Sequence, residues 1–122
     1  MISDLKLLQV YSAMAQHASQ SQQVSATNIS RANEPGYKAR EVESFTDYMA
    51  RLQQNPTSTT EVRDPNFKVG LANTPETLNG NSVNLEREIF KSAEAFGQHD
   101  MALSVYNKSL DLLRTALGRS GR

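Results

Sequence analysis

The sequence predicts an all-α protein whose long N-terminal and C-terminal helices pair as an antiparallel coiled coil, with a partly irregular segment between them. Residues 3–32 contain no Gly and no Pro. Residues 85–117 carry an unbroken stripe of mostly apolar residues at steps of four and three, as in a coiled coil. Frequent Pro, Gly and Thr between positions 53 and 82 indicate that the middle is irregular.

The N-terminal helix is expected over residues 3–32. Between Ile2 and Ser30 the two formally charged residues are Asp4 and Lys6, and most of the others are Leu, Ala, Ser, Gln, Met and Val. A helix on a protein surface normally has one charged side. This segment lacks such a side, so we expect the helix to pack among several close neighbours.

The helix is expected to stop near Ala32, so that residues 1–36 form one unit, the helix with its terminal turn. Glu34 precedes Pro35, which disfavours the α conformation at Glu34. Pro35 and Gly36 take the second and third positions of Glu34-Pro35-Gly36-Tyr37, which is the chemistry of a type II turn.

The middle of the chain divides into two segments. Residues 37–52 are expected to form a short helix or arm, because their apolar residues recur at spacings of 3, 3, 1 and 3: Val42, Phe45, Tyr48, Met49 and Leu52. Residues 53–82 show no convincing periodicity and are interrupted by several Pro and Gly residues. So long an irregular segment is unusual in a compact domain, and we expect a loop or arm that contacts partners.

The C-terminal segment, residues 83–122, is expected to be a long helix over about 84–117, with Asn84 as its N-cap. The predicted assembly seam consists of Leu85, Ile89, Ser92, Phe96, His99, Leu103, Tyr106, Leu110, Leu113 and Leu117. From the first of these residues to the last, the helix spans roughly 50 Å. A compact chain of this length has a radius of gyration of only about 14 Å, so the molecule should be elongated.

A second, less regular apolar row accompanies the seam. It consists of Phe90, Ala93, Gly97, Met101, Val105, Leu112 and Ala116. The N-terminal helix, folded back, can cover the seam. The second row then needs another molecule.

Composition and charge limit the classes of function. Leu, Ile, Val and Phe make up about one-fifth of the chain, close to the level at which a core becomes thin, which favours burial within an assembly. Thirteen basic and thirteen acidic residues give zero net charge. This balance argues against a nucleic-acid binder and against a polybasic membrane-surface protein. Without cysteine there is neither a disulfide nor a thiolate metal site.

The end of the N-terminal helix carries a motif. The segment Ala26–Ala39 resembles the N-terminal signature of the flagellar rod, hook and hook-associated protein family of bacteria, an Asn-rich helix end that runs into Thr-Pro-Gly-Tyr. The matching positions are Asn28, Ile29, Ala32, Asn33, Pro35, Gly36, Tyr37 and Lys38. A second segment, Gly80–Glu88 with the long helix that follows it, is similar to the proximal rod proteins of that family.

The resemblance implies a structural subunit of the proximal rod in the periplasmic part of the flagellar basal body, which transmits torque and lines the export channel. It implies partners of several kinds: copies of the chain, other rod proteins, membrane-ring and rod-base or export-gate proteins, and the type III export apparatus. Export without a cleaved signal peptide is implied as well, and the sequence at Met1–Lys6 does not look like a secretion signal. Phe45 with Met49 resembles the short element that such substrates present to the gate.

Catalytic, cofactor and metal sites are not expected. His17 and His99 are far apart in the sequence and on separate helices, and Glu86 and Glu88, two residues apart on a helix, do not face each other. Neither a nucleophile motif nor a glycine-rich phosphate loop is present. We therefore expect a protein that is not an enzyme, with no cofactor, no nucleic-acid partner and no membrane insertion. The alternative interpretation is a soluble helical adaptor or export chaperone that binds a partner helix through the same seam.

Overall fold

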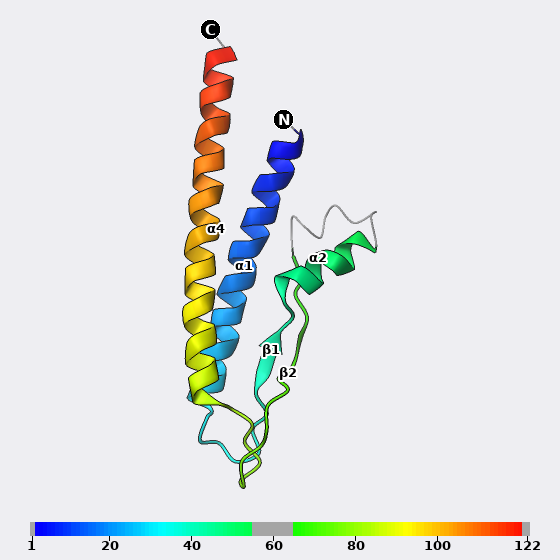
Figure 1. Cartoon of the computed structure of the whole chain (residues 1–122), viewed down its shortest axis with the longest axis vertical. Coiled ribbons are helices and arrows are strands. Elements are labelled where there is room, and N and C mark those ends of the chain that lie inside the picture. The colour runs from blue at the N-terminus through cyan, green and yellow to red at the C-terminus, as the bar shows by residue number, and fades with distance from the viewer. Residues whose placement is uncertain (1, 55–64, 121–122) are drawn as a thin grey trace.

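The protein is elongated, as the length of the C-terminal helix predicts. The structure, a computed structural model, describes residues 2–54 and 65–120. Helices α1 (Ile2–Ser30) and α4 (Leu85–Ser120) lie side by side, and the chain runs down the first and returns along the second, so the two termini lie at the same end (Figure 1). The mostly helical class is therefore confirmed.

Local chemistry accounts for where the helices begin and end. The Asn84 side-chain oxygen accepts a hydrogen bond from the Arg87 amide at 3.1 Å, so the predicted N-cap of α4 is confirmed. Helix α1 ends at Ser30, and the Tyr37 amide donates to the Glu34 carbonyl at 3.3 Å. Gly36 has φ +75°, which with this hydrogen bond matches the expected type II turn.

The surface of α4 that is covered is not the predicted seam. Its buried residues are Glu88, Ala95 and Ala102, each seven positions from the next, and α1 is the main element packed on α4. Five large seam residues are 40–65% exposed: Leu85, Ile89, Phe96, Leu103 and Leu117. The expectation that α1 covers the seam is wrong for these five residues. The physical reason is that alanines let two helix backbones approach more closely than leucines do.

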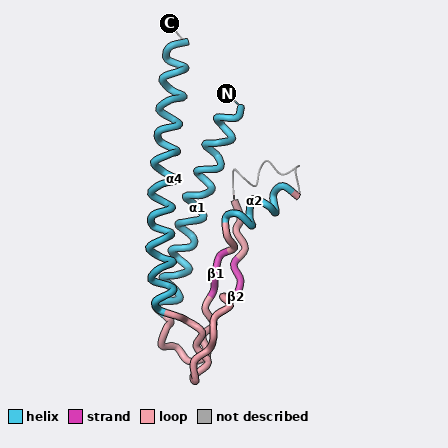
Figure 2. The backbone as a smooth tube through the Cα atoms, viewed as in Figure 1, coloured by secondary structure: helices cyan, strands magenta, loops and turns pink. Residues whose placement is uncertain are grey.

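The predicted irregular middle contains a two-stranded antiparallel ribbon that the sequence analysis missed. Strand β1 (Arg40–Val42) pairs with β2 (Val69–Leu71), with Glu41 opposite Gly70 (Figure 2). Strands of three residues are too short to show the alternation by which strands are predicted. Part of the predicted loop over 53–82, residues 55–64, lies outside the described residues.

The short helix expected within residues 37–52 is present as α2 (Phe45–Gln53). The Ser44 hydroxyl caps it by accepting a hydrogen bond from the Asp47 amide at 3.0 Å. Together, β1, α2 and β2 form what we call the arm. Its core is made by Val42, Tyr48, Leu52 and Phe67, with the Tyr48 and Phe67 rings 4.6 Å apart.

Polar contacts hold the arm against both long helices. His17 of α1 lies edge-on to the Phe67 ring, and its Nε2 is 2.6 Å from the Glu43 carbonyl oxygen. The Glu41 carboxylate pairs with Arg87 at 3.2 Å and also with Lys91 of α4. These contacts attach the first strand of the arm and the residue after it to α1 and to α4.

A second carboxylate stabilises the arm internally. The Glu43 carboxylate pairs with Arg51 at 2.6 Å and accepts a hydrogen bond from the Lys68 amide at 3.0 Å. Burial by itself would raise the pKa of Glu43, but the hydrogen bonds from Arg51 and Lys68 and the charges of both residues hold this pKa below its ordinary value. The contacts join the end of β1, α2 and the start of β2.

Candidate assembly interface

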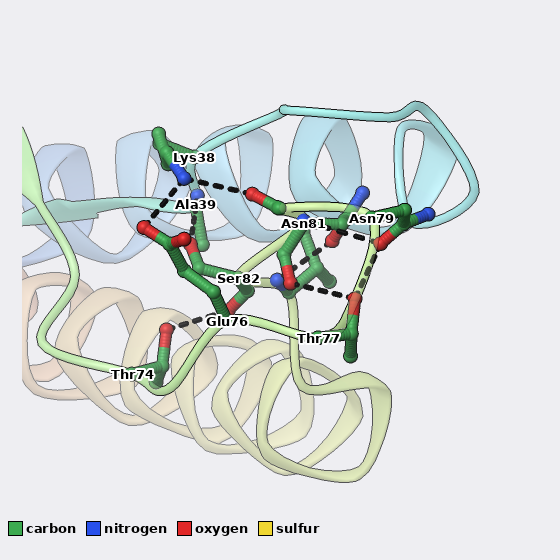
Figure 3. A network of polar contacts seen from close by, with 10 residues as sticks. Lys38, Ala39, Thr74, Glu76, Thr77, Asn79, Asn81 and Ser82 are labelled. Carbon is green, nitrogen blue, oxygen red and sulfur yellow. Dashed lines mark hydrogen bonds and ion pairs between the residues drawn. The ribbon is translucent and has the colours of Figure 1, made fainter.

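The two motif segments, about fifty residues apart in the sequence, meet at one end of the molecule. They form a set of hydrogen bonds that we call the loop network, between residues 28–40 and residues 74–83. Figure 3 shows part of the loop network, where side chains from the second segment lie against the backbone of the first. The network joins the end of α1, the start of the arm and the start of α4.

Asn28 connects α1 to the arm and is fully buried. Its Nδ2 donates to the Arg40 carbonyl oxygen at 2.8 Å. Its Oδ1 accepts from the Tyr37 hydroxyl at 2.9 Å and from the Arg40 amide at 3.1 Å. One side chain thus binds both backbone groups of the first residue in β1 and fixes where the strand leaves the helix.

Asn81 makes the corresponding connection from the second segment. Its Nδ2 donates to the carbonyl oxygens of Arg31 at 3.0 Å and Glu34 at 2.7 Å, where α1 ends and the turn begins. Its Oδ1 accepts from the Val83 amide at 2.8 Å. Asn81 therefore adds a second hydrogen bond to two carbonyl oxygens that also accept from the backbone amides of Glu34 and Tyr37.

Close backbone contact completes the junction. The Gly36 amide donates to the Asn79 carbonyl at 2.9 Å. Gly80 has φ +81°, and a Cβ atom added there would lie 3.4 Å from the Gly36 Cα. The positive φ at Gly36 and at Gly80 favours glycine at both positions.

Further bonds align the two segments. The Ser82 amide donates to the Tyr37 carbonyl at 3.0 Å, and the Ser82 hydroxyl accepts from the Ala39 amide at 2.8 Å. The Lys38 ammonium group binds the Gly80 carbonyl at 2.8 Å and the Glu76 carboxylate at 2.5 Å. Residues 36–39 and residues 76–82 are therefore joined by both backbone and side-chain hydrogen bonds and by an ion pair.

The predicted turn residues have different roles. Asn28, Gly36 and Tyr37 lie within the loop network, whereas Asn33 and Pro35 are exposed. The sequence analysis did not select Asn81 or Ser82, although both belong to the second motif segment. An Asn and a Ser directly after a glycine and before a capped helix are a signal that could have found them.

The seam and the second row of α4 leave two sets of large apolar residues exposed. Row A is the exposed part of the seam: Leu85, Ile89, Phe96, Leu103 and Leu117. Row B is the exposed large part of the second row: Phe90, Met101 and Leu112. The remaining seam residues are half-buried along the edge of the contact with α1: Ser92, His99, Tyr106, Leu110 and Leu113. Large exposed apolar residues in rows are typical of interaction surfaces.

Phe45 and Met49, the predicted export element, lie on α2. Both are half-buried and pack against the core of the arm. Their predicted role stays a prediction.

Two hollows flank the long helices. A groove of about 840 Å³ lies between the arm and the helix pair, and its lining includes His17, Val24, Lys91 and Ala95. A smaller groove of about 300 Å³ lies between α1 and α4, lined by Ser12, Ala15, Gln16, Ser19, His99, Leu103 and Tyr106. Over residues 2–54 and 65–120, no three His, Cys, Asp or Glu side chains form a group able to hold a metal ion.

Glu88 is a buried acid in the contact between the helices. It is 2% exposed, and its Oε2 has no hydrogen-bond partner among the residues that the structure describes. A buried polar atom without a partner opposes packing by about 1–3 kcal/mol. The contact between α1 and α4 therefore combines small side chains, Ala95 and Ala102, with the unfavourable burial of the Glu88 carboxylate.

Comparison with known proteins gives no assignment. No protein family matches the chain, and no curated protein matches it. In the described part of the chain, none of the helices combines the length and apolar character needed to cross a membrane.

Proposed function

We propose that the chain is a structural subunit of the proximal rod of the bacterial flagellar basal body, similar to the proximal rod protein FlgB. In this role it assembles helically with copies of itself and with other rod proteins, transmits torque and surrounds the export channel. The paired α1 and α4 would act there as an antiparallel coiled coil. Partners at the rod base, the membrane ring and the type III export apparatus, and a periplasmic location, belong to the same proposal.

The observation that carries the proposal is the loop network. The two segments that resemble the flagellar axial family are the two segments that bond to each other. The Asn81 side chain donates to the carbonyl oxygens of Arg31 and Glu34, and the Ser82 amide donates to the Tyr37 carbonyl oxygen. A resemblance that arose by chance would not be expected to select two distant segments that form one structural unit.

The surface of α4 supports the proposal. Rows A and B are exposed in the single chain, and α1 carries no formal charge between residues 7 and 30. Such helices are suited to close packing with neighbours. Closely packed seams resist bending and twisting because interdigitated side chains cannot slide past each other.

The test is incorporation into basal bodies. In the source bacterium, a strain lacking the gene is complemented with the wild-type chain, with Phe96→Asp or with Ser104→Asp, and basal bodies are isolated. Phe96 is 65% exposed, so an aspartate there leaves the monomer folded but would be buried without a partner in the rod. We expect Phe96→Asp to abolish incorporation and motility, while Ser104→Asp, at an exposed polar position about 100° around the helix from Leu103, retains both.

Two further variants extend the test. Leu110→Asp should also block incorporation, and Gly36→Val should impair it because Gly36 has φ +75°. Normal motility with both Phe96→Asp and Leu110→Asp would overturn the seam assignment. Absence of the wild-type chain from isolated basal bodies would overturn the proposed function itself.

One observation favours the alternative, a soluble helical adaptor or export chaperone. The groove of about 840 Å³ between the arm and the helix pair is open and lined by both apolar and charged residues, which suits a partner segment. An adaptor would be recovered with one soluble partner and not with basal bodies, so the fractionation of the wild-type chain distinguishes the two functions.

A further inference from the structure

The loop network contains a chemically labile pair of residues. Asn79 and Gly80 form the one Asn-Gly sequence in the chain, and every other asparagine precedes a residue with a side chain. Glycine has no Cβ, so the side-chain carbonyl carbon of the asparagine can be attacked by the glycine nitrogen without steric hindrance. Asn79 is exposed and lies in a turn. A reaction there would change the contact between the two motif segments.

The reaction is a spontaneous deamidation in water. The Gly80 nitrogen bonds to the Asn79 Cγ, and the bond from Cγ to Nδ2 breaks. Ammonia leaves with the proton of the Gly80 amide, and a five-membered succinimide ring remains. Water then opens the ring at one of its two carbonyl carbons. Opening at Cγ gives aspartate, whereas opening at the backbone carbonyl carbon of residue 79 gives isoaspartate, in which the chain continues through Cγ.

In the folded chain, both reacting groups are engaged in other bonds. The Gly80 amide donates to the Thr77 carbonyl oxygen at 2.9 Å. The Asn79 Oδ1 accepts from the Asn81 amide at 3.2 Å and also from the Thr77 hydroxyl (Figure 3). The Asn79 backbone carbonyl accepts from the Gly36 amide at 2.9 Å. Closing the ring moves these groups out of their bonds, so the loop network should slow the reaction.

The two products should differ in their effect on the loop network. Aspartate keeps an oxygen where the Asn81 amide and the Thr77 hydroxyl donate. The Asn79 Nδ2 donates no hydrogen bond within the described part of the chain, so its loss removes none there. Isoaspartate instead lengthens the backbone and takes the carbonyl that binds Gly36 out of the main chain. Because Gly80 lies close against Gly36, the longer backbone displaces both Gly80 and the residue after it.

We propose that Asn79-Gly80 is a deamidation site that the loop network protects in the folded chain and exposes in the unfolded chain, and that isoaspartate at this position disrupts the network. The inference does not depend on the flagellar role. Its consequence is chemical ageing restricted to the unfolded chain. A chain that stays unfolded too long loses the junction between α1 and α4.

The test follows deamidation of the purified full chain by peptide mass spectrometry, in mildly alkaline buffer with and without urea. We expect Asn79 to react at least about tenfold more slowly without urea, a ratio that needs an opening free energy of only about 1.4 kcal/mol. Asn81→Ala removes the side-chain bonds to Arg31 and Glu34, so it should speed the reaction in buffer and leave the rate in urea unchanged. Asn33→Ala, at an exposed position in the first motif segment, should change neither rate.

The consequence of the reaction is measured on its products. Chromatography separates the aspartate and isoaspartate forms, and urea unfolding followed by circular dichroism gives the midpoint of each. We expect the isoaspartate form to unfold at a lower urea concentration than the unmodified chain, and Asn79→Asp to unfold at the same concentration. Equal rates with and without urea, or no reaction at Asn79 in urea, would overturn the protected site. An isoaspartate form as stable as the unmodified chain would overturn its effect on the network.

Discussion

Replacing Asn28 with Ala should destabilise the folded chain by about 2–4 kcal/mol. The substitution removes three hydrogen bonds at once. The Asn28 Nδ2 donates to the Arg40 carbonyl oxygen, and the Asn28 Oδ1 accepts from the Arg40 amide and from the Tyr37 hydroxyl. Each lost bond costs about 0.5–1.5 kcal/mol net, and more where its partner stays buried. Both bonds to the Arg40 backbone are partly buried, which keeps the expected loss below that for fully buried groups.

Asn33 provides a matched control, because it belongs to the same motif but is exposed. Asn33→Ala should change stability by less than about 0.5 kcal/mol. Urea denaturation followed by circular dichroism measures both variants, and amide hydrogen exchange at Arg40 should rise in Asn28→Ala and not in Asn33→Ala. If the two variants were equally stable, or if exchange at Arg40 were unchanged, the central role of Asn28 would be refuted.

Gly80→Ala should lower stability by about 1–2 kcal/mol, because φ at Gly80 is +81° and the added Cβ would lie 3.4 Å from Gly36 Cα. Gly70→Ala is the control, because no atom lies within 4 Å of a Cβ added there. Thermal melts should show a lower melting temperature for Gly80→Ala and not for Gly70→Ala. Gly97→Ala should have the opposite sign and raise stability by about 0.5–1 kcal/mol, since Gly97 lies inside α4 with open space around it; a lower melting temperature would contradict this. Acidification should loosen the arm, because the folded pKa of Glu43 lies below its ordinary value of 4.5: its contribution is present above that value and is lost as the pH falls through the lower folded pKa. Amide exchange at Lys68, corrected for its intrinsic pH dependence, should show this step in the wild type and not in Glu43→Gln.

The long helices were predictable because they are long. Over thirty residues, the recurrence of apolar side chains at steps of four and three leaves little doubt about helix, and the absence of Gly and Pro extends the same conclusion to α1. The ribbon was not predictable from the pattern, because Arg40–Val42 and Val69–Leu71 each offer three residues. Its partners are also far apart in sequence, and no local signal reports such pairing.

The covered side of α4 was mispredicted for a different reason. Hydrophobicity selects the largest apolar residues, whereas the contact with α1 uses Ala95 and Ala102. The large apolar residues of the seam and the buried residues Glu88, Ala95 and Ala102 both repeat every seven positions. Periodicity alone therefore cannot show which of the two sets faces α1. If the proposed assembly is correct, the conspicuous stripe in the sequence belongs to contacts between chains, and the inconspicuous one to the contact within the chain.

Within the loop network, the turn at Gly36 followed from elementary chemistry, but the role of Asn81 did not. An asparagine can bond to its own neighbours in a turn or to a distant carbonyl, and the sequence does not distinguish these cases. The partners of Asn81 at Arg31 and Glu34 depend on how α1 ends and where the chain returns.

The position of the loop network has a consequence for the order of folding. The Asn81 bond to Arg31 closes a loop of 50 residues, and the entropy lost in closing a flexible loop of that size corresponds to about 3.5 kcal/mol. Once this loss has occurred, the end of α1 and the start of α4 are held together. Each further turn of helix then pairs with a neighbour already nearby, and the two helices can zip from the network toward the termini without closing another long loop.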